Sequence, residues 1–408
     1  MTRALRIAFL KPDFGVSGGF EAVLDRVESI AQTDGHDVRR VSVPIHPPRP
    51  AVAGLDIPRS VWDAAPEYFR YLAARTEFDR LDLRRFDLVV STQPPSFAAP
   101  HPRHLSLFYH HHRVYYDLED VYVRAGFAPD ETIHREAGRL VRELDQGPLE
   151  QVRWFLAGSA SVADRLSRFN GITKSSLFHA GLIAAADPTA PDGGPGALDP
   201  GHEAPAGPVL SVGRHEFPKR TELVVAAAHL LPGTTVSLVG TGGREAWARA
   251  LDHRLATTET DPAALTDEET WCNTGQITAE VPAGHRSNVE FTGRVSQEDL
   301  ARRFAAAPCV VAPAYLEDYG LTAIEAMATG TPVIVCTDGG GLTELVEHER
   351  TGLIVDPNPV AIADAIERLT EDPELARELG TNGRARAAVL SWSAAAAELR
   401  DGIDRVMA

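Results

Sequence analysis

The sequence predicts an α/β protein built from two doubly wound halves, and three observations lead to this prediction. Short apolar runs rich in Val, Ile, Leu and Phe recur along the 408 residues. Longer segments with helical periodicity separate these runs, and a stretch rich in Pro, Gly and Ala divides the chain near its middle. Such runs suit strands buried on both faces of a parallel sheet, and their alternation with helices places helices on both faces.

The predicted strands follow in chain order. In the first half they are residues 6–10, 38–43, 86–92, 104–110, 153–159 and 175–181. In the second half they are residues 208–214, 235–242, 289–295, 309–314, 332–340 and 352–357. Segments with a helical pattern include residues 20–32, 222–231 and 359–389.

Two irregular stretches interrupt the alternation of strands and helices, and the first of them sets the domain boundary. The stretch around 184–208 has no periodic apolar pattern, which is typical of a linker or a surface excursion. We therefore expect an N-terminal domain over residues 1–183, a linker over 184–207 and a C-terminal domain over 208–390. A second stretch, about 252–288, is acidic and polar, and we interpret it as a surface insertion or a lid.

Composition narrows the class of protein. The formal net charge is −17, which argues against a sequence-independent nucleic-acid binder, because such proteins need a basic surface. The three cysteines, Cys272, Cys309 and Cys336, are scattered and odd in number, as is typical of reduced thiols in a cytoplasmic protein. No apolar stretch approaches the roughly 18 residues of a membrane span. The first apolar run is too short for a signal peptide.

Ligands of α/β sheets bind at the carboxyl ends of the strands, so the residues that follow the predicted strands are the candidates for a site. After the first strand, the segment from Ser17 to Glu21 contains two glycines at the start of a helix. Paired glycines let backbone N–H groups approach a ligand, and the helix start adds a partial positive charge. A plain tight turn is the alternative. The glycine turn at 238–243 is a weaker signal of the same kind, since no acid at the required spacing completes a dinucleotide site.

The segment 212–219 places two cations, Arg214 and Lys219, after the first strand of the second half. Cations at this position would stabilise the charge that develops on a departing anionic group such as a diphosphate. The alternative is a pair of solvated surface cations.

The strongest signal is the segment 317–332. A strand leads into a polar loop that contains Glu317, a short helix begins near Gly320 with Glu325 about one turn inside it, and Gly330 ends the helix. The free N–H groups of the helix start suit a phosphate, and the two carboxylates suit sugar hydroxyls. Acids that merely stabilise the helix start are the alternative.

Three successive histidines follow the strand at 104–110, but they do not have metal-ligand spacing. Neighbouring loop residues point in different directions, and no acid or cysteine accompanies His110 or His111 at a suitable distance in the sequence. We expect one histidine to contact a ligand, with a solvated cluster as the alternative. An Asp-x-Asp at a strand end, a P-loop and a hydrolase elbow are absent from the sequence. No metal site is predicted.

The segment 317–332 resembles the E-x7-E signature of retaining GT-B glycosyltransferases, a family that includes bacterial mannosyltransferases and sucrose synthases. Other segments resemble this family in the same order, so that nearly the whole chain is covered. They are SGGFEAVL, LAGSASVADRL, VGRHEFPK, LVGTGG, VEFTGRVSQEDL and GGGLTELVEHERTGLIVDP. The terminal Ser-Trp-Ser and its helix, residues 391–408, resemble the segment that crosses back onto the first domain.

The resemblance implies a GT-B fold, in which two Rossmann-like domains face one another across a cleft. It implies that Arg214 and Lys219 neutralise the diphosphate of a donor, that Glu317 binds the transferred sugar, and that Glu325 binds the ribose. His110 would be the first domain's catalytic histidine, and His111 is the alternative because the alignment is ambiguous by one residue. Further donor contacts are implied at Gly18, Gly19, Gly213, Gly242, Val295, Tyr319, Gly320, Leu321 and Thr322, with Phe20 near the sugar or acceptor. Tyr319 stands where the family usually has Phe.

The expected activity is transfer of a sugar, with retention, from a UDP- or GDP-sugar to a small-molecule or lipid acceptor. Neither a metal nor a cofactor is expected. The partners are the donor and the acceptor, without nucleic acid or a transmembrane segment, and a homodimer is left open. The alternatives are a nucleotide-sugar epimerase of the same architecture, a non-catalytic nucleotide-sugar binding protein and, more remotely, an NAD oxidoreductase.

Overall fold

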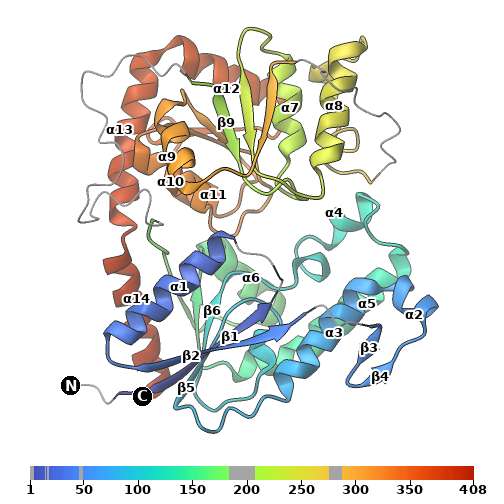
Figure 1. Cartoon of the computed structure of the whole chain (residues 1–408), viewed down its shortest axis with the longest axis vertical. Coiled ribbons are helices and arrows are strands. Elements are labelled where there is room, and N and C mark those ends of the chain that lie inside the picture. The colour runs from blue at the N-terminus through green and yellow to red at the C-terminus, as the bar shows by residue number, and fades with distance from the viewer. Residues whose placement is uncertain (1–3, 14, 16–17, 46–48, 183–206, 275–286) are drawn as a thin grey trace. The chain divides into compact units, whose positions relative to one another are not determined.

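A computed structural model of the chain describes residues 4–13, 15, 18–45, 49–182, 207–274 and 287–408 (Figure 1). The chain divides into two compact units. The first contains Met1–Gly181 together with Trp392–Ala408, and the second contains Leu182–Ser391. Almost all of the predicted linker lies outside the described residues.

The first unit is built on a parallel six-stranded sheet with the order β2-β1-β5-β6-β7-β8. Its strands are β1 (Arg6–Asp13), β2 (Asp37–Pro44), β5 (Leu88–Ser91), β6 (His104–Phe108), β7 (Trp154–Ala157) and β8 (Ser175–Leu177). The central strands are buried along their length, as their apolar runs predict, whereas β2 at the edge is mostly exposed.

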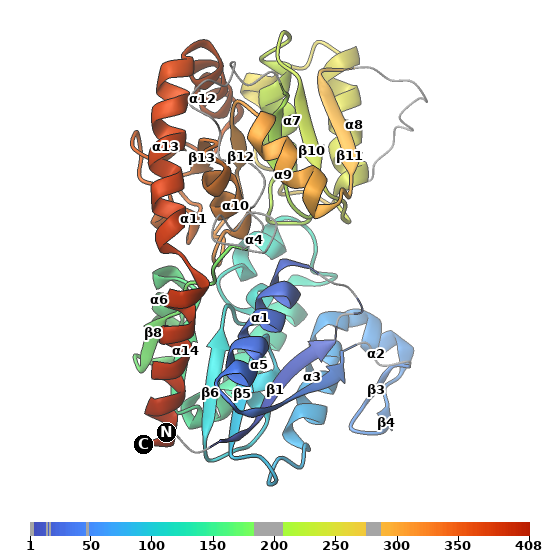
Figure 2. The same cartoon turned by 60° about the vertical axis from the view of Figure 1, so that its left-hand side comes forward.

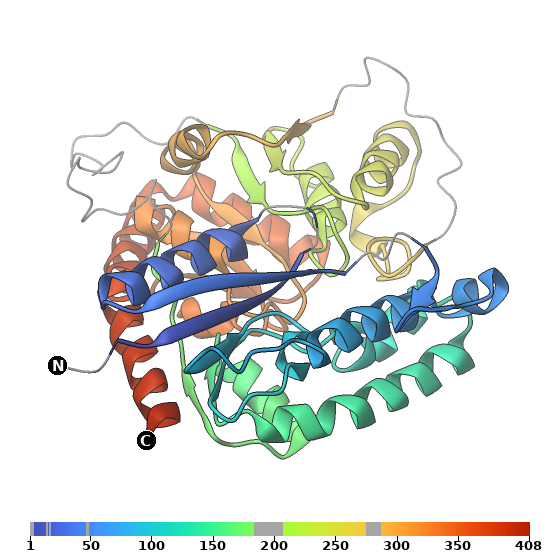
Figure 3. The ribbon, with the colours of Figure 1, turned by 60° about the horizontal axis from the view of Figure 1, so that its bottom comes forward.

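Helices cover both faces of this sheet. α1 (Gly19–Thr33) contacts α14 (Trp392–Met407). α5 (Glu131–Gln151) contacts both α3 (Pro66–Asp79) and α6 (Ala160–Asn170). Figure 3 shows α3 and α5 running side by side. The smaller elements are β3 (Ala51–Val52), β4 (Leu55–Asp56), α2 (Arg59–Ala64), η1 (Ser96–Ala98), η2 (Arg113–Tyr115) and α4 (Glu119–Arg124). The hairpin of β3 and β4 was not predicted.

The last helix, α14, completes the first unit although it follows the second unit in the sequence. It contacts β6, β7 and β8 (Figure 2). Leu399 and Val406 are fully buried, and the Arg400 guanidinium forms an ion pair with Asp34 at 2.8 Å. Glu398 accepts a hydrogen bond from the backbone N–H of His179 at 2.7 Å. The apolar face of α14 is therefore part of the first unit's core.

The second unit has a parallel six-stranded sheet with the order β11-β10-β9-β12-β13-β14. Its strands are β9 (Val209–Val212), β10 (Val236–Val239), β11 (Val289–Gly293), β12 (Val310–Ala312), β13 (Val333–Cys336) and β14 (Gly352–Val355). Numbered within this unit the order is 3-2-1-4-5-6, the arrangement of dinucleotide-binding sheets.

Seven α-helices accompany the second sheet in the described residues. α7 (Thr221–His229) packs with α8 (Glu245–Thr257) and α12 (Pro359–Glu371), and α10 (Leu321–Thr329) packs with α9 (Gln297–Ala306) and α13 (Pro373–Val389). α11 (Leu342–Leu345) is a single turn, and η3 (Pro262–Ala264) lies after α8. The segment predicted as helical over 359–389 is two helices, because the chain breaks at Asp372, whose carboxylate accepts a hydrogen bond from the backbone N–H of Leu375 at 3.0 Å.

The interpretation of residues 252–288 as a surface insertion is wrong for part of that stretch. Residues up to Thr257 belong to α8. Trp271 and Cys272 are buried, being 3% and 1% exposed, and the indole N–H of Trp247 donates to the carbonyl of Thr270 at 2.6 Å. Residues 275–286 lie outside the described residues. None of the helices in the described ranges is both long and apolar enough to cross a membrane.

Candidate functional site

The candidate site begins where two neighbouring strands of the second sheet diverge. β9 and β12 are paired at Leu210 and Val310, and the chain leaves them in opposite directions along the sheet. Their loops emerge together, and the backbone N–H of Tyr315 donates to the carbonyl of Pro218 at 3.0 Å. A point of this kind in an open α/β sheet forms the crevice in which ligands bind.

The two cations predicted in the first loop differ in their surroundings. The Nζ of Lys219 donates to Oε2 of Glu317, forming a half-buried ion pair between the two loops. An ammonium group has three donors, so this pairing leaves Lys219 able to bind an anion as well. The side chain of Arg214 is exposed and makes no ion pair with any described residue. The structure thus brings Lys219 and Glu317 together and leaves Arg214 at the rim.

A glycine run after β13 supports the Glu317 loop. The backbone N–H of Glu317 donates to the carbonyl of Gly339 at 3.0 Å, and the N–H of Gly341 donates to the carbonyl of Glu317 at 2.7 Å. A Cβ on Gly340 would lie 2.7 Å from the Glu317 carbonyl oxygen, and Gly340 also has a positive φ of 59°. Glycine is needed here because a side chain would push the loop away.

Helix α10 presents its start at the same crevice. Its N-cap is Gly320, with a φ of 101°, and a Cβ there would lie 2.6 Å from Cδ2 of Leu342. The backbone N–H groups of Gly320, Leu321 and Thr322 donate to no acceptor within the described ranges. Unpaired amides at a helix start can bind an anion, which is the property that the predicted phosphate contacts need.

Glu325 lies one turn inside α10 and is half-buried. Removal of water from around its carboxyl group raises its pKa to about 7. Its side chain has no hydrogen-bond partner among the described residues. A partly dehydrated carboxylate without a protein donor is suited to accept hydrogen bonds from ligand hydroxyls.

Of the two glycines predicted as donor contacts in the loops after β9 and β10, Gly242 has a steric reason to be glycine, whereas a Cβ on Gly213 would meet nothing within 4 Å. Gly240 has a φ of 130°, and a Cβ there would lie 1.9 Å from the carbonyl oxygen of Gly213. A Cβ on Gly242 would lie 2.3 Å from the carbonyl oxygen of His215. The turns after β9 and β10 therefore pack backbone against backbone. Val295 follows β11 and is half-buried.

In the first unit, the predicted glycine turn opens α1. The N–H of Gly18 already donates to Oε2 of Glu21 at 2.7 Å, so this amide is occupied, whereas the N–H of Gly19 has no acceptor among the described residues. Phe20 packs its ring edge-on against Tyr109, with centroids 5.2 Å apart. Ser17 lies outside the described residues.

The structure separates the three successive histidines. His111 is fully buried, its Nε2 is 2.8 Å from Oδ1 of Asn170, and burial lowers its pKa to about 3. His112 stacks on Tyr71 at 4.9 Å. His110 is half-buried, and its Nδ1 is 2.8 Å from the carbonyl oxygen of His111. A carbonyl can only accept, so in neutral His110 the proton lies on Nδ1 and Nε2 is an acceptor. This geometry favours His110 over His111 as a ligand contact.

A buried carboxylate next to these histidines, that of Asp145, was not predicted from the sequence. Asp145 in α5 is fully buried and accepts hydrogen bonds from the hydroxyls of Tyr71 at 2.7 Å and Tyr116 at 2.9 Å. Burial raises its pKa to about 7. The ring of Tyr116 in turn stacks on His111 at 4.1 Å. The available signal was the position of Asp145, four residues after the buried Val141 and thus on the apolar face of the helix.

Arg220, next to Lys219, was also missed. It is 1% exposed, and its guanidinium pairs with Asp338. No local sequence pattern distinguishes it from a surface arginine, because its partners lie far away in the chain.

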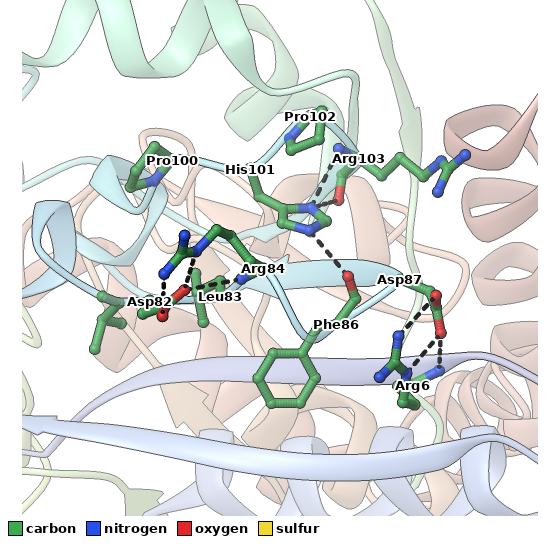
Figure 4. A pocket seen from close by; sticks show the side chains of 11 residues that line it. Arg6, Asp82, Leu83, Arg84, Phe86, Asp87, Pro100, His101, Pro102 and Arg103 are labelled. Atoms are coloured by element: carbon green, nitrogen blue, oxygen red, sulfur yellow. Dashed lines mark hydrogen bonds and ion pairs between the residues drawn. The ribbon is translucent and has the colours of Figure 1, made fainter.

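A hollow of about 640 Å³ in the first unit is not the candidate site (Figure 4). It lies at the amino ends of β1, β5 and β6, the edge of the sheet opposite to the carboxyl ends. Two of its cations are neutralised, since Arg6 pairs with Asp87 at 3.2 Å and Arg84 pairs with Asp82 at 2.8 Å.

The side chains that commonly bind metal ions are spread across the described ranges of the chain. There, no group of three or more His, Cys, Asp or Glu side chains is placed to hold an ion. Cys272, Cys309 and Cys336 are buried free thiols.

Comparisons with known proteins bear on the second unit first. Residues 282–386 match the family described as Glycosyl transferases group 1. Curated relatives include D-inositol 3-phosphate glycosyltransferases. The protein from Nocardioides sp. is 42% identical over 121 residues, 29% of this chain and 26% of the relative. The protein from Mycobacteroides abscessus is 35% identical over 204 residues, 49% of this chain and 40% of the relative. The chain therefore matches less than half the length of these relatives.

Solved structures match nearly the whole chain. Sucrose-phosphate synthase from Thermosynechococcus elongatus has a TM-score of 0.63 and 21% identity, covering 97% of this chain and 98% of that chain. HepE from Anabaena, solved with UDP and glucose, has a TM-score of 0.62 and 17% identity, covering 98% and 99%. WaaG, a glycosyltransferase involved in lipopolysaccharide biosynthesis, has a TM-score of 0.63 and 14% identity, covering 96% and 98%. These likenesses show the fold, and they confirm the predicted α/β GT-B class with its two Rossmann-like domains.

Proposed function

We propose that this chain transfers a sugar from a nucleotide-diphosphate donor to an acceptor, with retention of anomeric configuration and without a metal ion. The observation that supports this best is the crevice between β9 and β12. There Lys219, Glu317 and the open amides of α10 surround the position that a diphosphate and its sugar would occupy. HepE, a neighbour in fold, has been solved with UDP and glucose.

Each group has a distinct part in the proposed reaction. Negative charge accumulates on the diphosphate as the glycosidic bond breaks, and Lys219 with the amides of Leu321 and Thr322 would stabilise it. Glu317 would hold the sugar hydroxyls and Glu325 those of the ribose. Arg214, which is exposed in the same loop as Lys219, would contact the phosphates. His110 is the first unit's candidate for contact with the sugar.

The acceptor proton can leave with the diphosphate. We assign the role of covalent nucleophile to no carboxylate among the described residues, and Glu317 is held in an ion pair with Lys219. We therefore favour departure of the diphosphate and attack of the acceptor on the same face of the sugar, with a diphosphate oxygen taking the proton. Trapping of a glycosyl-enzyme intermediate would contradict this mechanism.

The acceptor is expected to be a small molecule or a lipid, bound by the first unit. The relatives named D-inositol 3-phosphate glycosyltransferases make a phosphorylated polyol the first acceptor to assay. An epimerase would consume donor without any acceptor, and a non-catalytic binding protein would bind nucleotide but leave the donor intact.

The deciding experiment is a thermal-shift panel with UDP, GDP, ADP and TDP. A ligand that binds only the folded state raises the melting temperature, so one diphosphate should stabilise the protein by linkage. Glu325→Ala should weaken that shift, and Glu367→Ala on the exposed face of α12 is the matched control. Absence of a shift with every nucleotide would overturn the proposed function, and an undiminished shift in Glu325→Ala would remove the ribose assignment.

The role of the ion pair is tested by turnover. Lys219→Ala should lower kcat by more than about tenfold, since removal of one preorganised charge costs on the order of 2–4 kcal/mol of transition-state stabilisation. Lys174→Ala, which removes a lysine of the first unit, should leave kcat unchanged. Equal kcat in Lys219→Ala and the wild type would refute this role for Lys219.

A further inference from the structure

A cluster of side chains behind the Lys219 loop has no part in the proposed chemistry. It consists of Arg220, Trp271, Tyr315 and Asp338, and we refer to it as the Arg220 cluster. We propose that this cluster is a positioning device for Lys219, and that Trp271, from the stretch predicted as a surface insertion, is one of its essential parts. This inference rests on the proposed function, because it concerns how the donor phosphates are bound.

The backbone at Arg220 is the first reason. Arg220 has a φ of 55° and a ψ of 38°, the left-handed region that a residue with a side chain adopts rarely. Such a conformation persists only when its surroundings impose it, and residues of this kind gather at functional sites. Arg220 directly follows Lys219 and is the N-cap of α7, so its backbone angles set the orientation of the Lys219 segment relative to α7.

The surroundings that impose this conformation come from three separate segments. The guanidinium carbon of Arg220 lies 5.0 Å from the ring centroid of Trp271 and 5.2 Å from that of Tyr315. The two rings are themselves 5.5 Å apart. A guanidinium within about 6 Å of aromatic ring centroids is attracted by the rings' electron-rich faces, and burial strengthens the attraction. On its remaining side the guanidinium forms an ion pair with Asp338.

The same cluster is joined to the loop that holds Glu317. Tyr315 lies two residues before Glu317, and its N–H bonds the carbonyl of Pro218 at 3.0 Å. The carbonyl of Asp338 accepts from the N–H of Leu316 at 2.9 Å. Tyr315 and Asp338, which contact the Arg220 guanidinium, thus also form backbone hydrogen bonds with the two loops that carry Lys219 and Glu317.

Trp271 is the part of the cluster that only this stretch supplies. Its ring stacks on Phe217 with centroids 5.4 Å apart and planes inclined by 26°. Its indole N–H donates to Asp267 at 3.1 Å. Trp271 thus supports the loop at two points, Phe217 and Arg220, on either side of Lys219. At 3% exposure it cannot itself contact a substrate to any useful extent.

The experiment compares binding of nucleoside diphosphates and monophosphates. Lys219 is expected to contact the diphosphate, whereas the base and ribose are held elsewhere, so a displaced Lys219 should weaken a diphosphate more than a monophosphate. We use UDP with UMP and GDP with GMP, measured by isothermal titration calorimetry, and take the ratio of the two Kd values. Trp271→Leu should lower the preference for the diphosphate by about tenfold, because loss of one hydrogen bond from a charged group weakens binding by at least about this factor.

Three further variants keep the test decisive. Trp271→Phe retains an aromatic face and should restore the wild-type ratio. Trp247→Leu removes a tryptophan that contacts residues 252–288 through the carbonyl of Thr270. This contact does not involve the Lys219 loop, so the variant should also keep the wild-type ratio of Kd values. Arg220→Lys retains the charge but loses the planar face, and it should reproduce the effect if Trp271→Leu does not fold.

The outcomes separate the two proposals. A wild-type ratio in both Trp271→Leu and Arg220→Lys would overturn the positioning role while leaving the proposed function intact. Failure of the wild type to bind UDP, GDP, ADP or TDP in the thermal-shift panel would overturn the proposed function and this inference with it. An equal loss of diphosphate and monophosphate binding would show that the cluster serves only general stability, and would also overturn the inference.

Discussion

At the residue scale, Glu325 shows how burial prepares a side chain for a ligand. Its carboxyl group has lost most of its water and gains no protein donor among the described residues, so burial raises its pKa to about 7 from the usual 4.5. Hydrogen bonds from ribose hydroxyls would favour the charged form and lower this pKa again. The proposed ribose contact therefore predicts that nucleotide binding and ionisation of Glu325 are coupled.

The coupling predicts a pH dependence with a definite sign. Because its pKa is raised in the folded state, Glu325 stabilises folding below its unfolded value of about 4.5, and that contribution is lost as the pH rises through about 7. The melting temperature of the unliganded wild type should fall relative to that of Glu325→Gln between about pH 5 and pH 8. Saturating diphosphate should reverse the trend, since the ligand stabilises the carboxylate.

Thermal shifts across this pH range, with and without the nucleotide, test the prediction. Taking the difference from Glu325→Gln cancels other groups that titrate nearby in pH, such as Asp145. If the melting temperatures of the wild type and Glu325→Gln vary with pH in the same way, both with and without the nucleotide, the pKa argument is contradicted.

At the scale of elements, the sequence predicted every strand of both sheets. Buried parallel strands require continuous apolar runs, and such runs are visible without any knowledge of their partners. The hairpin at 51–56 escaped because strands of two residues have no periodicity to detect. The sequence predicted one helix over 359–389 where the structure has two. The apolar residues before and after Asp372 follow nearly the same helical periodicity, so the pattern does not show the break.

The candidate site was predictable to the extent that its residues are local in the sequence. Glu317, Gly320 and Glu325 belong to one loop and helix, and their spacing indicated a site directly. The choice between His110 and His111 depended on which ring Asn170 and Tyr116 hold in the core, and those contacts are far away in the chain. Burial of Trp271 was not predicted for the same reason. Its neighbours in the sequence are polar, and the residues that it packs against are distant in the chain.

The packing of the two glycine turns gives a prediction at this scale. Gly240→Ala should destabilise the second unit by about 2 kcal/mol or more, because a Cβ would meet the Gly213 carbonyl at 1.9 Å while the backbone keeps a φ of 130°. Gly233→Ala is the matched control, since a Cβ there meets nothing within 4 Å. Chemical unfolding gives both values, and similar stability of the two variants would mean that the turns do not pack as described.

At the scale of the whole molecule, the units have separate cores, and α14 belongs to the first of them. We expect two calorimetric transitions, because domains with their own cores unfold as separate cooperative units. Leu399→Ala should lower the free energy of unfolding of the first unit by about 2–5 kcal/mol, the usual cost of a cavity at a fully buried leucine. The calorimetric transition of that unit should therefore move to a lower temperature.

Leu369→Ala in α12, where the leucine is equally buried, is the control for the second unit. The two variants should shift different transitions, although both positions lie in the last tenth of the chain. A shift of the same transition by both variants would show that α14 folds with the second unit.

The return of α14 has a consequence for the order in which a ribosome delivers the parts. The second unit is continuous in the sequence and can fold as soon as it emerges from the exit tunnel. The first unit, synthesised earlier, must wait with the apolar surface over Leu105 and Leu156 uncovered until the final helix is translated. During that interval the nascent chain exposes a surface that a chaperone can bind, so the unit made first is the one finished last.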